Sequence, residues 1–175
     1  SSEGKTVTIP LTASETDTQA VLTFTSQSYL AGIALTYTAP EEEFPGTPEN
    51  VAAEDVTYAF TSLDGLTDAT GATPADGTLE GEKGQYQDMK VDATAGKFYV
   101  QPEQSRVQVN AGTVLYLPAA YDEQGAVLLI SGTQDGSTPA NIRVNGESQT
   151  TNQPISLDMS DSSAYPQYVQ VEFDT

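Results

Sequence analysis

The dominant pattern along the chain is an alternation of apolar and polar residues. It begins near the N-terminus, where Val7, Ile9 and Leu11 alternate with threonines and Pro10. A period of two predicts strands with one face on a core and the other in water. β-branched and aromatic residues, which suit a pleated surface, fill most of these segments. Later alternating segments carry these apolar residues: Leu22, Phe24, Ile33, Leu35, Tyr37, Val56, Tyr58, Phe60, Val107, Val109, Ile155, Leu157, Val169, Val171 and Phe173.

Two segments, residues 114–117 and 127–130, are apolar on both faces. Such segments are typical of central strands that are buried on both sides. Residues 122–125 (Asp-Glu-Gln-Gly) lie between them and predict a turn, so the two strands are expected to pair as a hairpin. The pair Asn145-Gly146 predicts a second hairpin, because both residues tolerate positive φ.

Helix signals are scarce. At most one short helix is expected, near residues 48–55, where Thr47 can cap and Pro48 suits the first helical position. Two segments are expected to form long loops. Residues 40–48 contain Glu41-Glu42-Glu43 and three prolines, and residues 63–85 are rich in Gly, Asp, Thr and Ala. The pattern predicts an all-β chain, a single β-sandwich of jelly-roll-like type. Residues 1–12 are expected to be an N-terminal tail and candidate donor strand, and residues 13–175 the sandwich domain.

The charge narrows the choice of partners. Six Lys and Arg stand against 25 Asp and Glu, which gives a formal net charge of -19. This field repels nucleic acid and anionic membranes, because binding to either requires clustered basic residues. No apolar run is long enough to span a bilayer, so membrane insertion is not expected. The acidity favours solubility, or life in salty water, and cation binding is the alternative interpretation.

The composition also excludes several kinds of chemistry. The chain contains no Cys and no His. Nucleophilic pairs that use His, and zinc sites built on Cys or His, are therefore excluded. Glycosidase chemistry needs two carboxylates, but among 25 acidic residues some pair always has suitable spacing, so such a pair is no evidence for this chemistry. We therefore expect a protein that is not an enzyme.

Calcium is the metal that best suits this composition. Calcium takes oxygen ligands from carboxylates and carbonyls, often in loops rich in Asp and Gly. The competing interpretation is that these Asp residues close turns with their own backbone, and the sequence leaves both open. The candidate ligands are Asp64, Asp68, Asp76, Asp122, Glu123, Asp158 and Asp161.

The segment of residues 5–12 (Lys-Thr-Val-Thr-Ile-Pro-Leu-Thr) is a clean amphipathic strand near the start of the chain. It can be an ordinary first strand at a sheet edge, which Pro10 favours because it has no N–H for a ladder. It can also be a donor strand that completes the sheet of a neighbouring copy. In that case Val7, Ile9 and Leu11 would fill an apolar groove on the next copy.

An acidic, Thr-rich chain without Cys and with this N-terminal strand resembles subunits of extracellular filaments. The families are archaeal bundling pili and cannulae, and the TasA-type fibre proteins of bacterial biofilms. The resemblance implies a secreted subunit that forms a homopolymer by donor-strand exchange, sometimes with calcium at the junctions. Pro10 departs from the pattern, because without an N–H it disfavours full pairing on both sides. A chain that begins with Ser1 instead of Met also suits a mature product of the extracellular space or cell surface.

Two other functions fit the same composition. One is a monomeric carbohydrate-binding or adhesin domain with tyrosines that stack on glycans of a cell surface. The other is a virion decoration protein. The tyrosines considered for a sugar-binding surface are Tyr86, Tyr99, Tyr116, Tyr121, Tyr165 and Tyr168.

Overall fold

The computed structural model describes residues 44–49 and 51–174, all within one unit, Glu42–Thr175. The described part contains twelve β-strands and one short 3₁₀ helix, Pro102–Gln104. Its sheets are antiparallel, and the strand content confirms the prediction of an all-β, sandwich-like fold. Predictions that concern residues 5–12, 22–24 and 33–37 lie outside the described residues.

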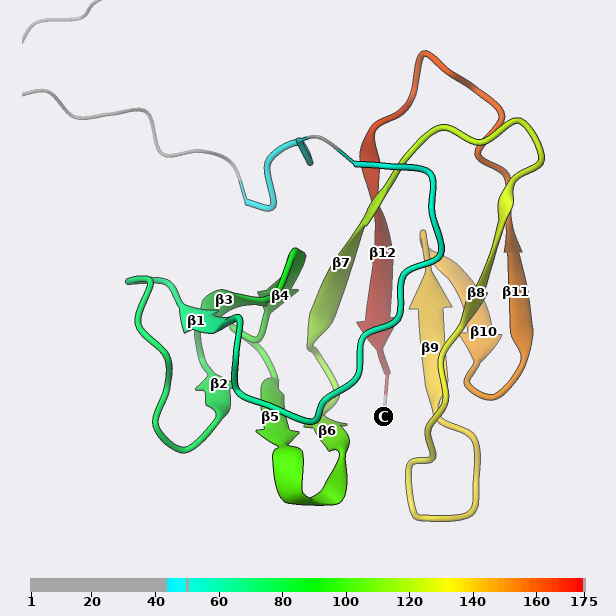
Figure 1. The fold of residues 1–175 in the computed structure, drawn as a ribbon. Helices are drawn as coiled ribbons and strands as arrows, with labels where there is room; N and C mark the ends of the chain where they lie inside the picture. Colours follow the sequence, from blue (N-terminus) through cyan, green and yellow to red (C-terminus); the bar gives the residue numbers. More distant parts are fainter. Residues whose placement is uncertain (1–43, 50, 175) are drawn as a thin grey trace, which may run out of the picture. The chain divides into compact units, whose positions relative to one another are not determined.

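The largest sheet has seven strands in the order β1-β3-β4-β7-β12-β9-β10 (Figure 1). Its longest pairing joins β7 to β12, with Leu115 opposite Val171 and Leu117 opposite Val169. The strands are β1 (Leu66–Asp68), β3 (Lys83–Tyr86), β4 (Met89–Asp92), β7 (Val114–Ala119), β12 (Gln167–Phe173), β9 (Asn141–Val144) and β10 (Glu147–Thr150).

Two smaller sheets accompany the large one. The first has the order β2-β5-β6, with β2 (Thr78–Glu80), β5 (Lys97–Gln101) and β6 (Arg106–Val109). The second pairs β11 (Pro154–Leu157) with β8 (Ala126–Leu129). Figure 1 shows the two small sheets toward opposite ends of the large one.

The core explains why the alternating segments became strands. In strands such as β5, buried residues alternate with more exposed ones: Phe98 and Val100 are buried there. One part of the core is aromatic: the ring of Phe60 lies 5.1 Å from that of Tyr86 and 6.0 Å from that of Phe98. The hydroxyl of Tyr86 donates to the carbonyls of Ala59 and Ser62, at 3.0 and 3.2 Å.

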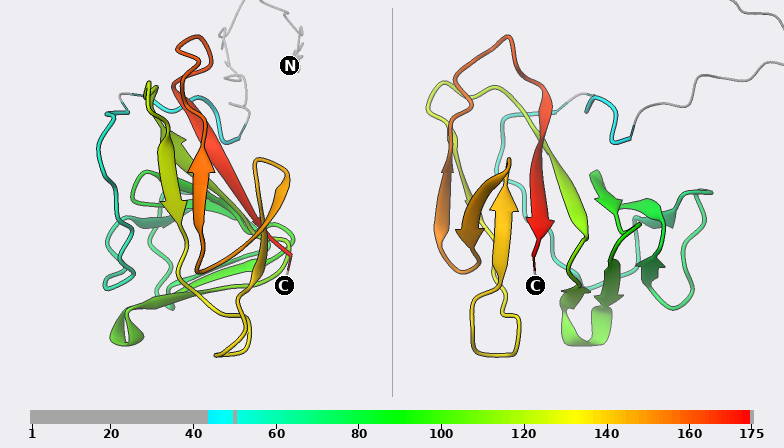
Figure 2. Two further views of the ribbon diagram at one scale, coloured as in Figure 1. Left: turned by 90° about the vertical axis from the view of Figure 1, so that its right-hand side faces the viewer. Right: turned by 180° about the vertical axis from the view of Figure 1, so that it is seen from behind.

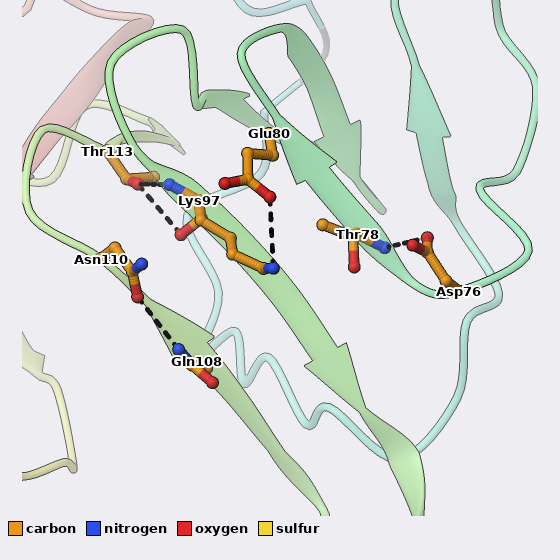
Figure 3. Close-up of polar contacts among 7 residues, drawn as sticks. All are labelled: Asp76, Thr78, Glu80, Lys97, Gln108, Asn110 and Thr113. Carbon is orange, nitrogen blue, oxygen red and sulfur yellow. Dashed lines mark hydrogen bonds and ion pairs between the residues drawn. The ribbon is translucent and has the colours of Figure 1, made fainter.

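Polar contacts hold the three-stranded sheet in place (Figure 3). The buried hydroxyl of Thr113, just before β7, bonds to both backbone groups of Lys97 in β5. The ammonium of Lys97 lies 3.2 Å from a carboxylate oxygen of Glu80 in β2. The carboxylate of Asp76 accepts the N–H of Thr78 at 3.0 Å, which closes the turn that leads into β2.

Three sequence predictions about local structure are corrected. Residues 114–117 and 127–130 do not form a hairpin, because the chain between them passes from the seven-stranded sheet to the two-stranded one. Residues 63–85 are not one long loop: they contain β1, β2 and most of β3, anchored by the buried Leu66 and Leu79. No helix is assigned at residues 48, 49 and 51–55, where the expected segment of one or two turns is too short to be stable by itself.

The second predicted hairpin is confirmed. Glu147 pairs with Val144 across the two-residue turn Asn145-Gly146, which joins β9 to β10. Both turn residues have positive φ, 48° for Asn145 and 85° for Gly146. Asparagine and glycine tolerate this conformation better than other residues, which is why the dipeptide was informative.

Candidate functional site

A large open groove lies on the unit. Its volume is 2030 Å³. Leu117 of β7, which is half-buried, lines it, and Val169 and Val171 of β12 border it but are already buried. Residues 105–111, which include β6, and residues 125–136, which include β8, also line it. We call it the β6–β8 groove.

Both strands that give the groove its name have an open edge. Strand β6 is the last strand of its sheet and pairs with β5 alone. Strand β8 pairs with β11 alone. Within residues 44–174 no strand pairs with the second edge of either one. Each second edge therefore offers backbone N–H and C=O groups that no described strand uses.

Strand β8 departs most from its sequence prediction. Residues 127–130 were expected to be buried on both faces, yet the side chains of Val127 and Leu129 are 68% and 60% exposed. Leu128 and Ile130, in contrast, pack against the core, and Leu128 stands opposite the buried Ile155 of β11. A strand with the composition of a sheet interior thus lies at an edge.

Residues 51–61, which we call the strap, also line the groove. Figure 1 shows the strap crossing in front of β7 and β12, and the right-hand view of Figure 2, seen from behind, shows it on the far side of them. One end is fixed by Phe60, which packs on Tyr86 and Phe98. Toward the other end Val56 is 56% exposed. The predicted strand of Val56, Tyr58 and Phe60 does not form, since no described residue of the strap lies in a ladder.

Tyr58 fixes the middle of the strap. Its hydroxyl donates to a carboxylate oxygen of Asp88 at 2.8 Å. Burial, and then the hydrogen bond to this carboxylate, raise the pKa of Tyr58 above its ordinary value. The hydroxyl therefore stays protonated and keeps donating throughout the physiological pH range.

The predicted calcium ligands are distributed around the unit. Asp64 and Asp68 lie around β1, Asp76 precedes β2, and Asp122 and Glu123 lie in the β7–β8 connection. Asp158 and Asp161 follow β11. The N–H of Asp122 donates to the carbonyl of Met159 at 3.2 Å, so the β7–β8 connection meets the segment after β11. Across the described ranges, no three or more acidic side chains gather in a way that could hold a metal ion.

Most of these carboxylates bond to the backbone just after them. Asp68 accepts from Thr70 and Ala72, Asp122 from Gln124, and Asp158 from Ser160. Asp161 accepts the hydroxyl of Ser163 at 2.6 Å and its N–H at 2.9 Å. Hydrogen bonds from hydroxyl and backbone donors lower the pKa of Asp68, Asp158 and Asp161. This geometry matches the turn-closing role that competed with calcium binding in the sequence.

The six tyrosines do not form one surface. Tyr86 is buried in the core, whereas Tyr121 is 42% exposed in the β7–β8 connection. Tyr116 and Tyr168 come together: their rings lie 6.2 Å apart and nearly perpendicular, at 79°. Phe44 adds a third ring, 5.6 Å from Tyr116. A shallow pocket of 450 Å³ borders Tyr116 and Tyr168, with the polar Gln167, Gln170 and Asn145 around it.

The sequence predicts a subunit interface formed by Val7, Ile9 and Leu11, and these three residues lie outside the described residues. It did not name the groove that would receive them. The signal that could have located the groove is the apolar run of residues 127–130, which the sequence predicts to be a central strand buried within its own chain.

The comparisons with known proteins leave the site to be interpreted from its own geometry. No protein-family model matches the chain. No curated protein and no solved structure matches it either. In the part of the chain that the structure describes, no helix has the length and apolar character needed to cross a membrane.

Proposed function

We propose that this protein is an extracellular structural subunit that assembles with copies of itself into a filament or tube. In the proposed assembly, a strand of one copy is added to an open sheet edge of the next. The observation that carries the proposal is the β6–β8 groove, which combines an apolar floor with two strand edges that no described strand occupies.

The groove has the physical properties of a strand acceptor. An open edge presents a row of backbone donors and acceptors that an added strand can pair with. The half-buried side chains of Leu117 and Leu128 supply apolar contacts along the groove. Each large aliphatic side chain that becomes fully buried there would contribute about 1.5–3 kcal/mol. Backbone pairing and apolar burial together favour an extended segment over a small ligand.

The proposed donor is the segment of residues 5–12. Its three apolar residues, Val7, Ile9 and Leu11, alternate and so lie on one face when the segment is extended. That face matches an apolar floor, while the alternating threonines suit the solvent side. The donor would therefore bury its apolar face without burying a charge.

Deletion of residues 1–12 tests the assembly. Electron microscopy and light scattering should show polymers for the full chain and monomers for the truncated chain. A sharper pair of variants keeps the length constant. The change V7T/I9T/L11T should abolish polymers, because it removes the apolar face, whereas T6S/T8S/T12S should leave them intact. Normal filaments from the truncated chain would refute the donor role of this segment.

Calcium is a separate part of the proposal. Acidic surfaces repel each other when copies meet, and a divalent cation at the junction would offset this repulsion. A saturating chelator should then lower both the melting temperature and the amount of polymer, and added calcium should restore them. No change in either quantity would remove calcium from the proposal.

A second candidate function is glycan binding, favoured by the ring cluster of Phe44, Tyr116 and Tyr168. The bordering pocket of 450 Å³ suits a small ligand, and aromatic rings with nearby amides are typical of sugar sites. A glycan array would detect such binding. The variant Y168A should abolish it and Y99A, in β5, should not. An array with no hit, together with polymers in the microscope, would leave the structural subunit as the better account.

A further inference from the structure

Two open edges line the groove, and they are not equivalent. We infer that β8, and not β6, is the edge that receives residues 5–12 of a second copy. This inference rests on the proposed function and specifies the acceptor strand. It also specifies which edge of the donor forms the ladder.

Strand β8 carries no charge to oppose a new neighbour. Its four residues, Ala126–Leu129, are all apolar, and Val127 and Leu129 are 68% and 60% exposed. Long apolar edges without charge are the ones that pair readily with another chain. Among the described residues β8 has one strand neighbour, β11, so its second edge can accept a donor.

Strand β6 has the opposite character. Its exposed positions are Arg106 and Gln108, and both side chains already make polar contacts. The guanidinium Nε of Arg106 donates to Gln101 at 2.6 Å, and the amide of Gln108 donates to Asn110 at 3.1 Å. Charged and polar side chains at an edge are a common protection against pairing.

Pro10 determines which edge of the donor can pair. In an extended strand, successive residues direct their backbone N–H and C=O groups to opposite edges. One edge of the donor therefore carries the groups of Thr6, Thr8, Pro10 and Thr12, and it lacks the N–H of Pro10. The other edge carries the groups of Val7, Ile9 and Leu11 and is complete. A donor that forms one ladder, with β8 through this complete edge, uses every N–H it needs.

The side chains fit the same arrangement. In β8 the core-facing row continues through Leu128 to Ile130, and both pack against the core cluster. A strand added beside β8 places its own inward row next to these two residues and above Leu117 of β7, which also lines the groove. Val7, Ile9 and Leu11 are the donor residues that form such a row. Apolar side chains of the second copy would then cover Leu128, Ile130 and Leu117.

Cross-linking between two differently tagged chains tests the choice of edge. The chain has no Cys, so each engineered thiol is the sole one in its chain. Chains with T8C are mixed under polymerising conditions with chains carrying V127C or L129C in β8, or Q108C in β6. A short bis-maleimide should link position 8 to β8 at least about tenfold more than to β6, the ratio expected from a 1.4 kcal/mol preference.

The other outcomes are equally informative. Preferred linkage to Q108C would overturn the inference and leave the proposed function standing. Filaments without linkage to either strand would do the same. A link within single chains of the double variant T8C/V127C would show that the segment fills the groove of its own chain and would overturn the inference. Absence of polymers from the unmodified chain would mark the failure of the proposed function itself.

Proline substitutions test the donor edge independently. T8P removes an N–H from the edge that Pro10 already interrupts, so polymers should form at nearly the same protein concentration. I9P removes an N–H from the complete edge, and I9A controls for the loss of the side chain. Relative to I9A, I9P should raise the protein concentration needed for assembly about tenfold, as loss of one ladder hydrogen bond predicts. Equal effects of T8P and I9P would overturn this assignment of the donor edge.

Discussion

The hydroxyl of Thr113 is bonded to both backbone groups of Lys97. It accepts the N–H of Lys97 at 2.9 Å and donates to its carbonyl at 3.1 Å (Figure 3). The Thr113 side chain is fully buried. One side chain thus acts as a short piece of β-ladder between the three-stranded sheet and the start of β7.

Replacement of this hydroxyl should destabilise the unit. T113V keeps the shape of the side chain but leaves the N–H of Lys97 without its partner, while the carbonyl of Lys97 still accepts the N–H of Asn110. The cost of leaving buried polar groups unsatisfied is about 1–3 kcal/mol. Urea denaturation should show this loss in the free energy of unfolding, whereas T113S, which keeps the hydroxyl, should lose less. Equal losses in the two variants would assign the effect to packing instead of hydrogen bonding.

Gly84 in β3 should tolerate no side chain. A Cβ atom at this position would lie 2.3 Å from the carbonyl oxygen of Thr67 and 2.7 Å from Leu79. The contact with Thr67 is to backbone, so the β1–β3 pairing itself would have to shift. G84A should cost about 1–3 kcal/mol, as overpacked sites do. The matched control is G132A, because a Cβ at Gly132 meets nothing within 4 Å; its melting temperature should stay near that of the parent chain.

The turn at Asp135 should lose its contribution to stability in strong acid. Its carboxylate accepts from the N–H groups of Thr138 and Ser137 at 2.7 and 2.9 Å, and these bonds lower its pKa to about 2. Because the pKa is lowered in the folded state, the ionised carboxylate stabilises the protein at pH values above its ordinary pKa of 3.8. That stabilisation is lost as the pH falls toward 2. An NMR titration of the Asp135 carboxyl carbon measures this directly, and a midpoint near 4 would contradict it.

The exposed apolar residues of β8 should matter more for assembly than for folding. Val127 and Leu129 make little use of burial in the isolated unit, so V127T/L129T should change the free energy of unfolding by less than about 1 kcal/mol. The same variant should reduce polymer formation strongly, since it makes the edge polar. The comparison is L128A, which removes a core contact and should lower the melting temperature. Unchanged polymer yield in V127T/L129T would count against β8 as an acceptor.

Much of the strand content was predictable because each strand buries one face. The period-two patterns of β6, β11 and β12 were visible in Val107 and Val109, in Ile155 and Leu157, and in Val169, Val171 and Phe173. The turn of Asn145-Gly146 was predictable because its chemistry is local. The strands of residues 66–86 were missed, because each carries a single apolar residue (Leu66, Leu79 or Tyr86), and one residue shows no period.

Pairing and the site depended on information that is not local. Whether β7 pairs with β8 or with β12 is decided by contacts across the whole unit, and the turn predicted at residues 122–125 favoured the wrong partner. The groove was not predicted for a related reason. An apolar run indicates that a strand is stabilised by burial, but it does not indicate which chain covers the strand. Calcium ligands and turn-closing residues are both Asp side chains in loops rich in Gly, so spacing in the sequence alone did not separate the two roles.

The most direct test of strand addition uses the acceptor without its own donor. A fluorescent peptide with the sequence of residues 5–12 is titrated with the chain that lacks residues 1–12, and its anisotropy is followed. We predict saturable binding that V127T/L129T in the protein weakens and that a peptide with Val7, Ile9 and Leu11 changed to Thr does not show. Equal binding of the parent and altered peptides, or no binding of the parent peptide at all, would contradict the claim that the β6–β8 groove receives this strand.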